Sequence, residues 1–176
     1  MAVNCTTDIG LGRRALEGSE KALGKEHPDT LTGVSSLAGV LRDQGKYEAA
    51  EEMNRRALEG REKAFGKEHL STLTSVSNLA MVLQYQGKYE VAEEMNRRAL
   101  ERSEKALGKK HPSTLASVYN LAFLFHQQQQ HEAASVLYQR ASSGYERVLG
   151  PEHPTTIACA RHYSSLLQEM RWRQQL

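Results

Sequence analysis

Four histidines recur along the chain at a constant spacing: His27, His69, His111 and His153. Imidazole nitrogens bind transition metals and exchange protons near neutral pH, so these side chains are the first candidates for chemistry. A metal site needs several ligands that converge on one point, whereas equivalent positions on successive packed helices lie roughly 10 Å apart. We therefore interpret each histidine as a linker residue that bonds a neighbouring backbone group. The sequence predicts no metal site and no cofactor.

Two cysteines are the remaining candidates for nucleophilic chemistry. Cys5 belongs to an expected irregular N-terminal segment, and Cys159 lies in a helical stretch among small residues. Sequence spacing places no histidine beside either of them, and the chain has no glycine-rich phosphate loop. Two cysteines are also too few for a disulfide framework, which fits a reducing compartment. The sequence thus predicts a cytoplasmic protein that is not an enzyme.

The spacing of the histidines belongs to a repeat that covers nearly the whole chain. Residues 13–54 and 55–96 are identical at 32 of 42 positions, and residues 55–96 and 97–138 at 22. A period of this size is typical of solenoids, whose units stack because none can bury its apolar face alone. Since stacked units present an extended surface, binding is the first function to consider.

Each repeat has the pattern of two helices. In the second repeat, apolar side chains recur every three or four residues from Leu73 to Leu83, and a further helical run extends from Tyr89 to Leu107. Glycine follows both runs, as it commonly does at helix ends. Pro28, Pro112 and Pro154 are expected to begin helices. The oxygens expected to cap the first helices belong to Asp29, Ser71 and Ser113.

The charges are interleaved, and the net charge is only +2. Acids precede bases by four residues at Glu51/Arg55, Glu52/Arg56, Glu59/Lys63, Glu93/Arg97, Glu94/Arg98 and Glu101/Lys105. This spacing favours local ion pairs on a solvated helix face over a catalytic array of carboxylates. The chain lacks both the basic stripe that nucleic acid requires and an apolar run of 18–20 residues. We expect neither nucleic acid nor a membrane as a partner.

The segment from Leu37 to Glu59, repeated from Leu79 to Glu101, resembles the tetratricopeptide repeat. It reads Leu-Ala-x-x-Leu-x-x-Gln-Gly-Lys-Tyr-Glu-x-Ala-Glu-x-x-x-Arg-Arg-Ala-Leu-Glu. The long unit, 42 positions from one copy to the next, and the Gly-Lys-Glu-His-Pro linker resemble the kinesin-light-chain subtype. The near-identical copies are also similar to the repeat arrays of fungal nucleotide-binding immune-type proteins.

The resemblance implies an all-α fold: a right-handed superhelical solenoid of about seven to eight helices in antiparallel pairs. Small side chains would let the helices approach closely, at Ala38, Ala80, Ala122, Ala50, Ala92, Ala134, Ala57, Ala99 and Ala141. We expect a single solenoid over residues 1–176. We call the first and second helix of each pair the first-type and the second-type helix. Residues 1–23 would be a partial unit that has a second-type helix only. Residues 24–65, 66–107 and 108–149 would be full units, and residues 150–176 would be a polar capping helix.

The resemblance also implies that the first helix of each unit lines a concave groove. The amides of Asn78 and Asn120 are the leading candidates there, because an amide both donates to and accepts from a peptide backbone. Their alternative role is to bond a neighbouring helix. The other candidate peptide contacts are Tyr119, Phe123, Tyr85, Met81, Arg42 and Arg161. For Phe123, core packing is the alternative.

The third repeat departs from the pattern at its turn, where residues 127–131 read Gln-Gln-Gln-Gln-His. Loss of the turn glycine costs roughly 1 kcal/mol if a left-handed residue is still required. A longer helix or a different turn would avoid that cost. Tyr138 also supplies an aromatic ring where the earlier copies have Asn54 and Asn96.

These patterns predict a protein–protein interaction scaffold that binds an extended peptide or a partner helix in the concave groove. The alternative is an oligomerisation or autoinhibitory sensor arm of a larger nucleotide-binding signalling protein, with self-association through the N-terminal edge.

Overall fold

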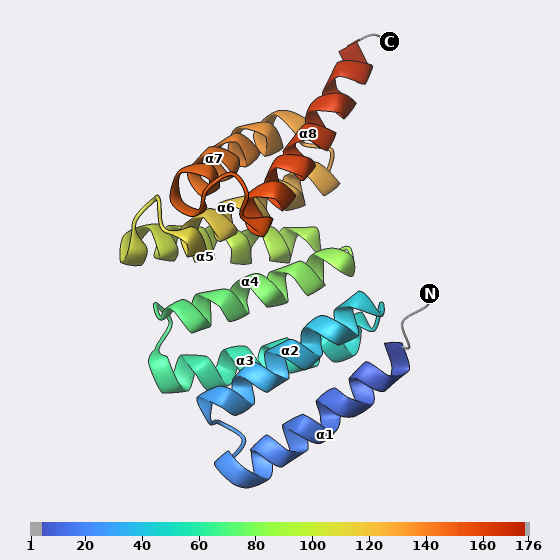
Figure 1. The fold of residues 1–176 in the computed structure, drawn as a ribbon, viewed down its shortest axis with the longest axis vertical. Coiled ribbons are helices and arrows are strands. Elements are labelled where there is room, and N and C mark those ends of the chain that lie inside the picture. Colours follow the sequence, from blue (N-terminus) through green and yellow to red (C-terminus); the bar gives the residue numbers. More distant parts are fainter. Residues whose placement is uncertain (1–4, 175–176) are drawn as a thin grey trace. The chain divides into compact units, whose positions relative to one another are not determined.

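The computed structural model describes the backbone of residues 5–174 and the side chains of residues 9–173. This part of the chain is all-α and confirms the predicted fold class (Figure 1). Its eight helices are α1 (Cys5–Leu23), α2 (Pro28–Asp43), α3 (Tyr47–Phe65), α4 (Leu70–Tyr85), α5 (Tyr89–Leu107), α6 (Pro112–Gln127), α7 (His131–Leu149) and α8 (Pro154–Gln174). Prolines begin three of them, as predicted. The N-terminal segment expected to be irregular is helical from Cys5 onward.

The chain forms two compact units, Met1–Lys88 and Tyr89–Leu176, here called the N-terminal unit and the C-terminal unit. In the N-terminal unit, α2 packs against α1 and α3, and α3 packs against α4. In the C-terminal unit, α6 packs against α5 and α7, and α7 packs against α8. The first helices of the repeats also touch within each unit, α2 with α4 and α6 with α8. Each unit therefore has two adjacent first-type helices.

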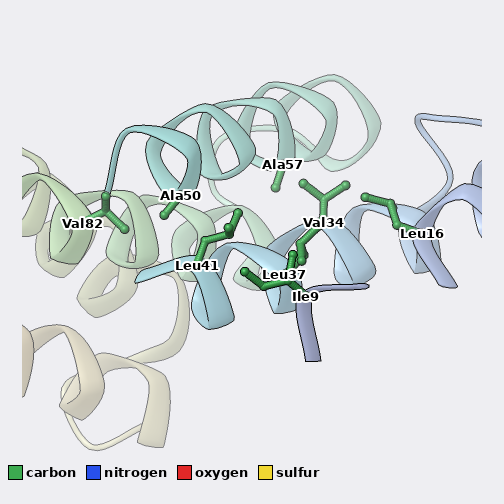
Figure 2. Packing of buried hydrophobic residues seen from close by; sticks show 8 residues of the cluster. All are labelled: Ile9, Leu16, Val34, Leu37, Leu41, Ala50, Ala57 and Val82. Carbon is green, nitrogen blue, oxygen red and sulfur yellow. The ribbon is translucent and has the colours of Figure 1, made fainter. Parts of the chain in front are cut away.

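Figure 2 shows the core of the N-terminal unit, in which leucine and valine side chains of α2 point toward α1 and α3. Ala50 and Ala57 of α3 have no exposed surface. Their counterparts in α7, Ala134 and Ala141, are equally buried. A methyl side chain at each contact lets two helices approach closely, which confirms the expected role of these small positions.

The recurring histidines cap the first-type helices. In each linker the Nδ1 atom accepts a hydrogen bond from the backbone N–H two residues later, at distances of 3.1–3.2 Å in His27, His69, His111 and His153. This confirms their predicted bonding to the backbone. The expected caps at Asp29, Ser71 and Ser113 are wrong, because the preceding histidine occupies the N-cap position and these residues supply the N–H groups that it binds.

The surface ion pairs are partly those expected from the spacing. Glu51–Arg55, Glu93–Arg97 and Glu94–Arg98 pair at 2.8, 2.8 and 3.6 Å. Arg56 binds Glu20 of α1 instead of Glu52, and Lys63 binds Glu26 instead of Glu59. A carboxylate from an earlier segment of the chain therefore competes with the carboxylate four residues before the base. Among the described helices, none is both long and apolar enough to cross a bilayer.

The altered turn of the third repeat has the same backbone conformation as the turn of the first repeat. Gly45 has φ 73° between α2 and α3, and Gln129 takes the same left-handed conformation, with φ 62°, between α6 and α7. The closing hydrogen bonds also match: Lys46 N–H donates to Leu41 O, and Gln130 N–H to Phe125 O, both at 2.9 Å. The chain thus retains the turn despite the steric cost of a non-glycine residue.

Candidate functional site

Arg42 and Met81 lie together in the N-terminal unit, on the two adjacent first-type helices. The Arg42 Nη1 atom is 2.9 Å from the Met81 sulfur, and Nε and Nη2 bind the Asp43 carboxylate at 2.9 and 2.7 Å. The guanidinium is therefore partly neutralised by its own neighbour. Met81 remains half-buried, as an adaptable contact on this face.

Asn78 and Tyr85 extend the same face of α4, because residues seven apart lie two turns along one side of a helix. The Tyr85 side chain is 46% exposed and stacks on Tyr47, with ring centroids 5.6 Å apart and planes 4° apart. Asn78 is half-buried. Among the described residues, its amide has no hydrogen-bond partner, so it is not used to hold a neighbouring helix there.

Tyr119 and Phe123 lie together in the C-terminal unit, around a histidine of α8. The Tyr119 hydroxyl oxygen is 2.6 Å from His162 Nδ1. The His162 ring also stacks on both aromatic rings, at centroid distances of 5.7 Å from Tyr119 and 5.5 Å from Phe123. Burial lowers the pKa of His162, and nearby His126 and Arg161 lower it further, so its imidazole is neutral near pH 7.

His162 lies on a predicted groove-lining helix but was not among the peptide contacts chosen from the sequence. The repeat register held the signal, because His162 occupies the position of Asn78 and Asn120 in its own copy. Asn120 is half-buried, with no hydrogen-bond partner for its amide in the described part of the chain, and Arg161 is exposed on α8. Phe123 is also only half-buried, so it is not simply a core residue.

A hollow of about 320 Å³ opens beside this cluster in the C-terminal unit. Its lining combines one aromatic ring with polar groups: Phe123, His126, Gln127, Gln129, His162, Ser165 and Glu169. This volume is at the lower end of the range for small-ligand pockets. It is large enough to take a side chain of a bound polypeptide.

A second histidine cluster borders the hollow. His126, the last but one residue of α6, places Nε2 3.0 Å from Glu169 Oε2 of α8. His131, the first residue of α7, places Nε2 3.9 Å from the same oxygen. The hydrogen bond from His126 is the main reason why the pKa of Glu169 lies below its ordinary value. Sequence reasoning missed this cluster, since it compared only histidines at equivalent repeat positions.

The cysteine that the structure describes is unsuited to nucleophilic catalysis. Cys159 is buried, and burial raises the pKa of its thiol to about 11. Little reactive thiolate forms at neutral pH under these conditions. The side chain of Cys5 lies outside the described side chains.

The described chain consists of helix pairs with small residues at their contacts, repeated at a constant period. This architecture defines a helical repeat protein. The chain belongs to the tetratricopeptide repeat family, whose pattern matches residues 9–63, 32–105, 71–146 and 113–174. This membership confirms the resemblance to the tetratricopeptide repeat, and proteins built from these repeats generally mediate protein–protein interaction.

Solved structures with the same fold include proteins named as kinesin light chains. A Podospora anserina putative kinesin light chain with nearly identical TPR-like repeats has a TM-score of 0.70 and 26% identity, over 97% of this chain and 81% of that one. A variant of it with methionine in place of one glutamine has a TM-score of 0.71 at the same identity and coverage. BtubC (BKLC) from P. vanneervenii has a TM-score of 0.76 and 21% identity, over 96% of this chain and 67% of that one, and shows the shared fold. No curated protein matches the chain.

Proposed function

We propose that this chain is a protein-interaction scaffold whose first-type helices bind an extended peptide or a partner helix. The observation that carries the proposal is the face of the C-terminal unit around His162, where two half-buried rings lie beside a hollow. Asn120 lies one helical turn before Phe123, on the same side of α6.

The chemistry of this face suits a polypeptide. The Asn120 amide can donate to a backbone carbonyl and accept from a backbone N–H whatever the side chains of the bound segment are. Phe123 and Tyr119 can contact an apolar side chain that enters the hollow, as aromatic anchors do in interfaces. Arg161 is exposed on α8, one residue before His162, and its charge favours an acidic residue in the partner.

The N-terminal unit has a similar set of candidate peptide contacts on α2 and α4. Asn78 again supplies an amide that has no hydrogen-bond partner among the described residues, and Met81 and the exposed ring of Tyr85 supply apolar contact. Arg42 contributes less charge than Arg161, because Asp43 binds it directly. We infer that this face supports the same kind of ligand with weaker charge selectivity.

A peptide-display selection against the whole chain, followed by titration of the selected peptides, tests the proposal. Replacement of Asn120 with Ala should weaken binding by about 1–3 kcal/mol, the scale of a buried polar group left unpaired in the partner. Asn78→Ala should do the same for peptides that reach the N-terminal unit. Gln139→Ala is the matched control, since it removes an exposed amide from the second-type helix α7.

If both asparagine variants bind the selected peptides as tightly as the original chain while keeping their helicity, the first-type helices are not the binding face. Loss of binding in Gln139→Ala alone would assign the function to the second-type helices. Selection of no peptide by a folded chain would count against an extended peptide as the ligand.

A second function, an oligomerisation or autoinhibitory arm of a larger signalling protein, is favoured by α1. Its side chains Leu11 and Leu23 are 56% and 48% exposed, which gives the N-terminal unit apolar surface that a partner can cover. Sedimentation over a range of concentrations tests self-association. If the chain sediments as a monomer at every concentration, and Leu11→Ser sediments in the same way, self-association is excluded.

The remaining expectations belong to the same proposal: a non-catalytic, cytoplasmic protein whose partner is neither nucleic acid nor a membrane. They are supported by the buried, protonated thiol of Cys159 and by basic side chains that alternate with acidic ones. A filter-binding titration with duplex DNA and single-stranded RNA should show no retention at physiological salt.

A further inference from the structure

We propose that His126, His131 and Glu169 form a binding site for a divalent transition metal ion of the Zn²⁺ type. One potential ligand atom from each of the three side chains lies within 4.8 Å of the other two. The site would join the turn between α6 and α7 to α8, within the C-terminal unit. It borders the hollow of the proposed peptide-binding face, but its metal binding does not require a bound peptide.

The donor set suits this class of ion. Two imidazole nitrogens and one carboxylate oxygen form the protein ligands of many zinc sites that keep a fourth position for water. In a tetrahedral site with bonds of about 2.0–2.1 Å, ligand atoms lie about 3.4 Å apart. The observed separations from Glu169 Oε2, 3.0 Å to His126 and 3.9 Å to His131, bracket that value. All three ligand atoms lie within 4.8 Å of one another, so the two imidazoles must approach each other when an ion binds.

A buried, unsatisfied nitrogen supplies independent support. The residue His131 is 3% exposed, and its Nε2 atom has no hydrogen-bond partner in the described part of the chain. A buried polar atom without a partner is costly and calls for an explanation. This atom faces Glu169 Oε2 at 3.9 Å, beyond hydrogen-bonding distance. A metal ion between the two atoms would satisfy both.

The surroundings hold the ligands in place. The Ser165 hydroxyl donates to the other Glu169 oxygen at 3.4 Å, which leaves Oε2 for the site. The His126 ring packs edge-on against Tyr138 at 6.1 Å and against His131 at 5.9 Å. Supporting contacts of this kind orient metal ligands. The hollow lined by Phe123, Ser165 and Glu169 gives the fourth coordination position access to water.

The N-terminal unit provides an internal comparison. The equivalent positions two repeats earlier are Arg42, Tyr47 and Tyr85, and the last two stack with their ring centroids 5.6 Å apart. The repeat backbone therefore brings these positions together in both units. Only in the C-terminal unit do the side chains there carry metal-binding atoms.

The test is a calorimetric titration of the whole chain with Zn²⁺ near neutral pH, repeated with Co²⁺ and its visible absorption. One ion should bind per chain, and Co²⁺ should give the intense bands of a tetrahedral site. His131→Ala and Glu169→Gln should each weaken Zn²⁺ binding at least about 10-fold. His153→Ala is the matched control, because it removes an exposed linker histidine, and it should bind as the original chain does.

Loss of a buried side chain can unfold His131→Ala, so Glu169→Gln, at a partly exposed position, is the decisive variant. Zn²⁺ should raise the melting temperature of the original chain and of His153→Ala, but not that of Glu169→Gln. Absence of binding, unchanged affinity in folded Glu169→Gln, or an equal loss in His153→Ala would each overturn the proposal.

Discussion

Gly144 tests the close helix contact on which the repeat packing depends. A Cβ atom added at this residue of α7 would lie 2.4 and 2.8 Å from the two methyl carbons of Leu115 and 3.2 Å from its Cγ. Leu115 is 2% exposed and has little room to move. We expect the Gly144→Ala substitution to cost about 1–3 kcal/mol in overpacking, offset by about 1 kcal/mol of helix propensity.

Gly18 supplies the matched control, because it holds the same repeat position in α1. A Cβ atom there has no neighbour within 4 Å. Gly18→Ala should therefore gain about 1 kcal/mol of helix propensity without a steric cost. The difference in free energy of unfolding between the two alanine variants isolates the contact with Leu115. It should be about 1–3 kcal/mol, with Gly144→Ala the less stable.

Urea unfolding followed by far-UV circular dichroism and by tyrosine fluorescence measures both variants. The assignment to Leu115 is checked in a Leu115→Ala background, where Gly144→Ala should become stabilising because the colliding methyl groups are gone. Equal stabilisation by Gly18→Ala and Gly144→Ala in the original chain would refute the reasoning. It would mean that Leu115 yields freely and that the small residue is not required.

Three further outcomes follow from the C-terminal unit. Gln129→Gly should raise the free energy of unfolding by about 1 kcal/mol, since glycine adopts the left-handed conformation without steric cost, as urea unfolding would show. In a Cys5→Ser chain, Cys159 should react with a thiol reagent only on unfolding, because its thiol is buried and its pKa of about 11 keeps it protonated; rapid labelling of the native chain at pH 8 would contradict this. The hydrogen bond from His126 lowers the pKa of Glu169. The ionised Glu169 carboxylate therefore stabilises the folded chain above the ordinary pKa of 4.5, and this contribution to the free energy of unfolding is lost as the pH falls through the lowered pKa. Urea unfolding in chelator at several acidic pH values should show a smaller loss of stability for Glu169→Gln than for the original chain.

The fold could be predicted largely because the signal repeats. A helix face that is ambiguous in one copy becomes clear when the same spacing returns in the next. Accordingly, α5 spans the predicted Tyr89–Leu107, and α2, α6 and α8 begin at the predicted prolines, whereas α1 begins within a segment expected to be irregular. The helix caps could not be predicted in the same way. Ordinary preference favours Asp or Ser oxygens, whereas the structure places His27 and its equivalents, two positions before them, at the N-cap.

The candidate site was predicted in part. The repeat register identified Tyr119 and Phe123, and the structure places both beside His162. The register places His126 and Glu169 on groove-lining helices, but it did not predict that they meet His131, because the three residues hold different repeat positions on three helices. Their meeting depends on how α8 packs against α7 and on the shape of a turn that the sequence left open.

The repeat positions that meet at this turn show how chemistry can change while the backbone stays the same. In the N-terminal unit, Tyr47 and Tyr85 make the contact by stacking, which depends little on metal ions or on pH near neutrality. In the C-terminal unit, His131 and Glu169 occupy the equivalent positions, and Gln129 adopts the glycine conformation between the helices. A histidine–carboxylate cluster can bind a metal ion, and two stacked phenol rings cannot. The strength of the contact in the C-terminal unit should therefore vary with metal ions, and that of the equivalent contact in the N-terminal unit should not.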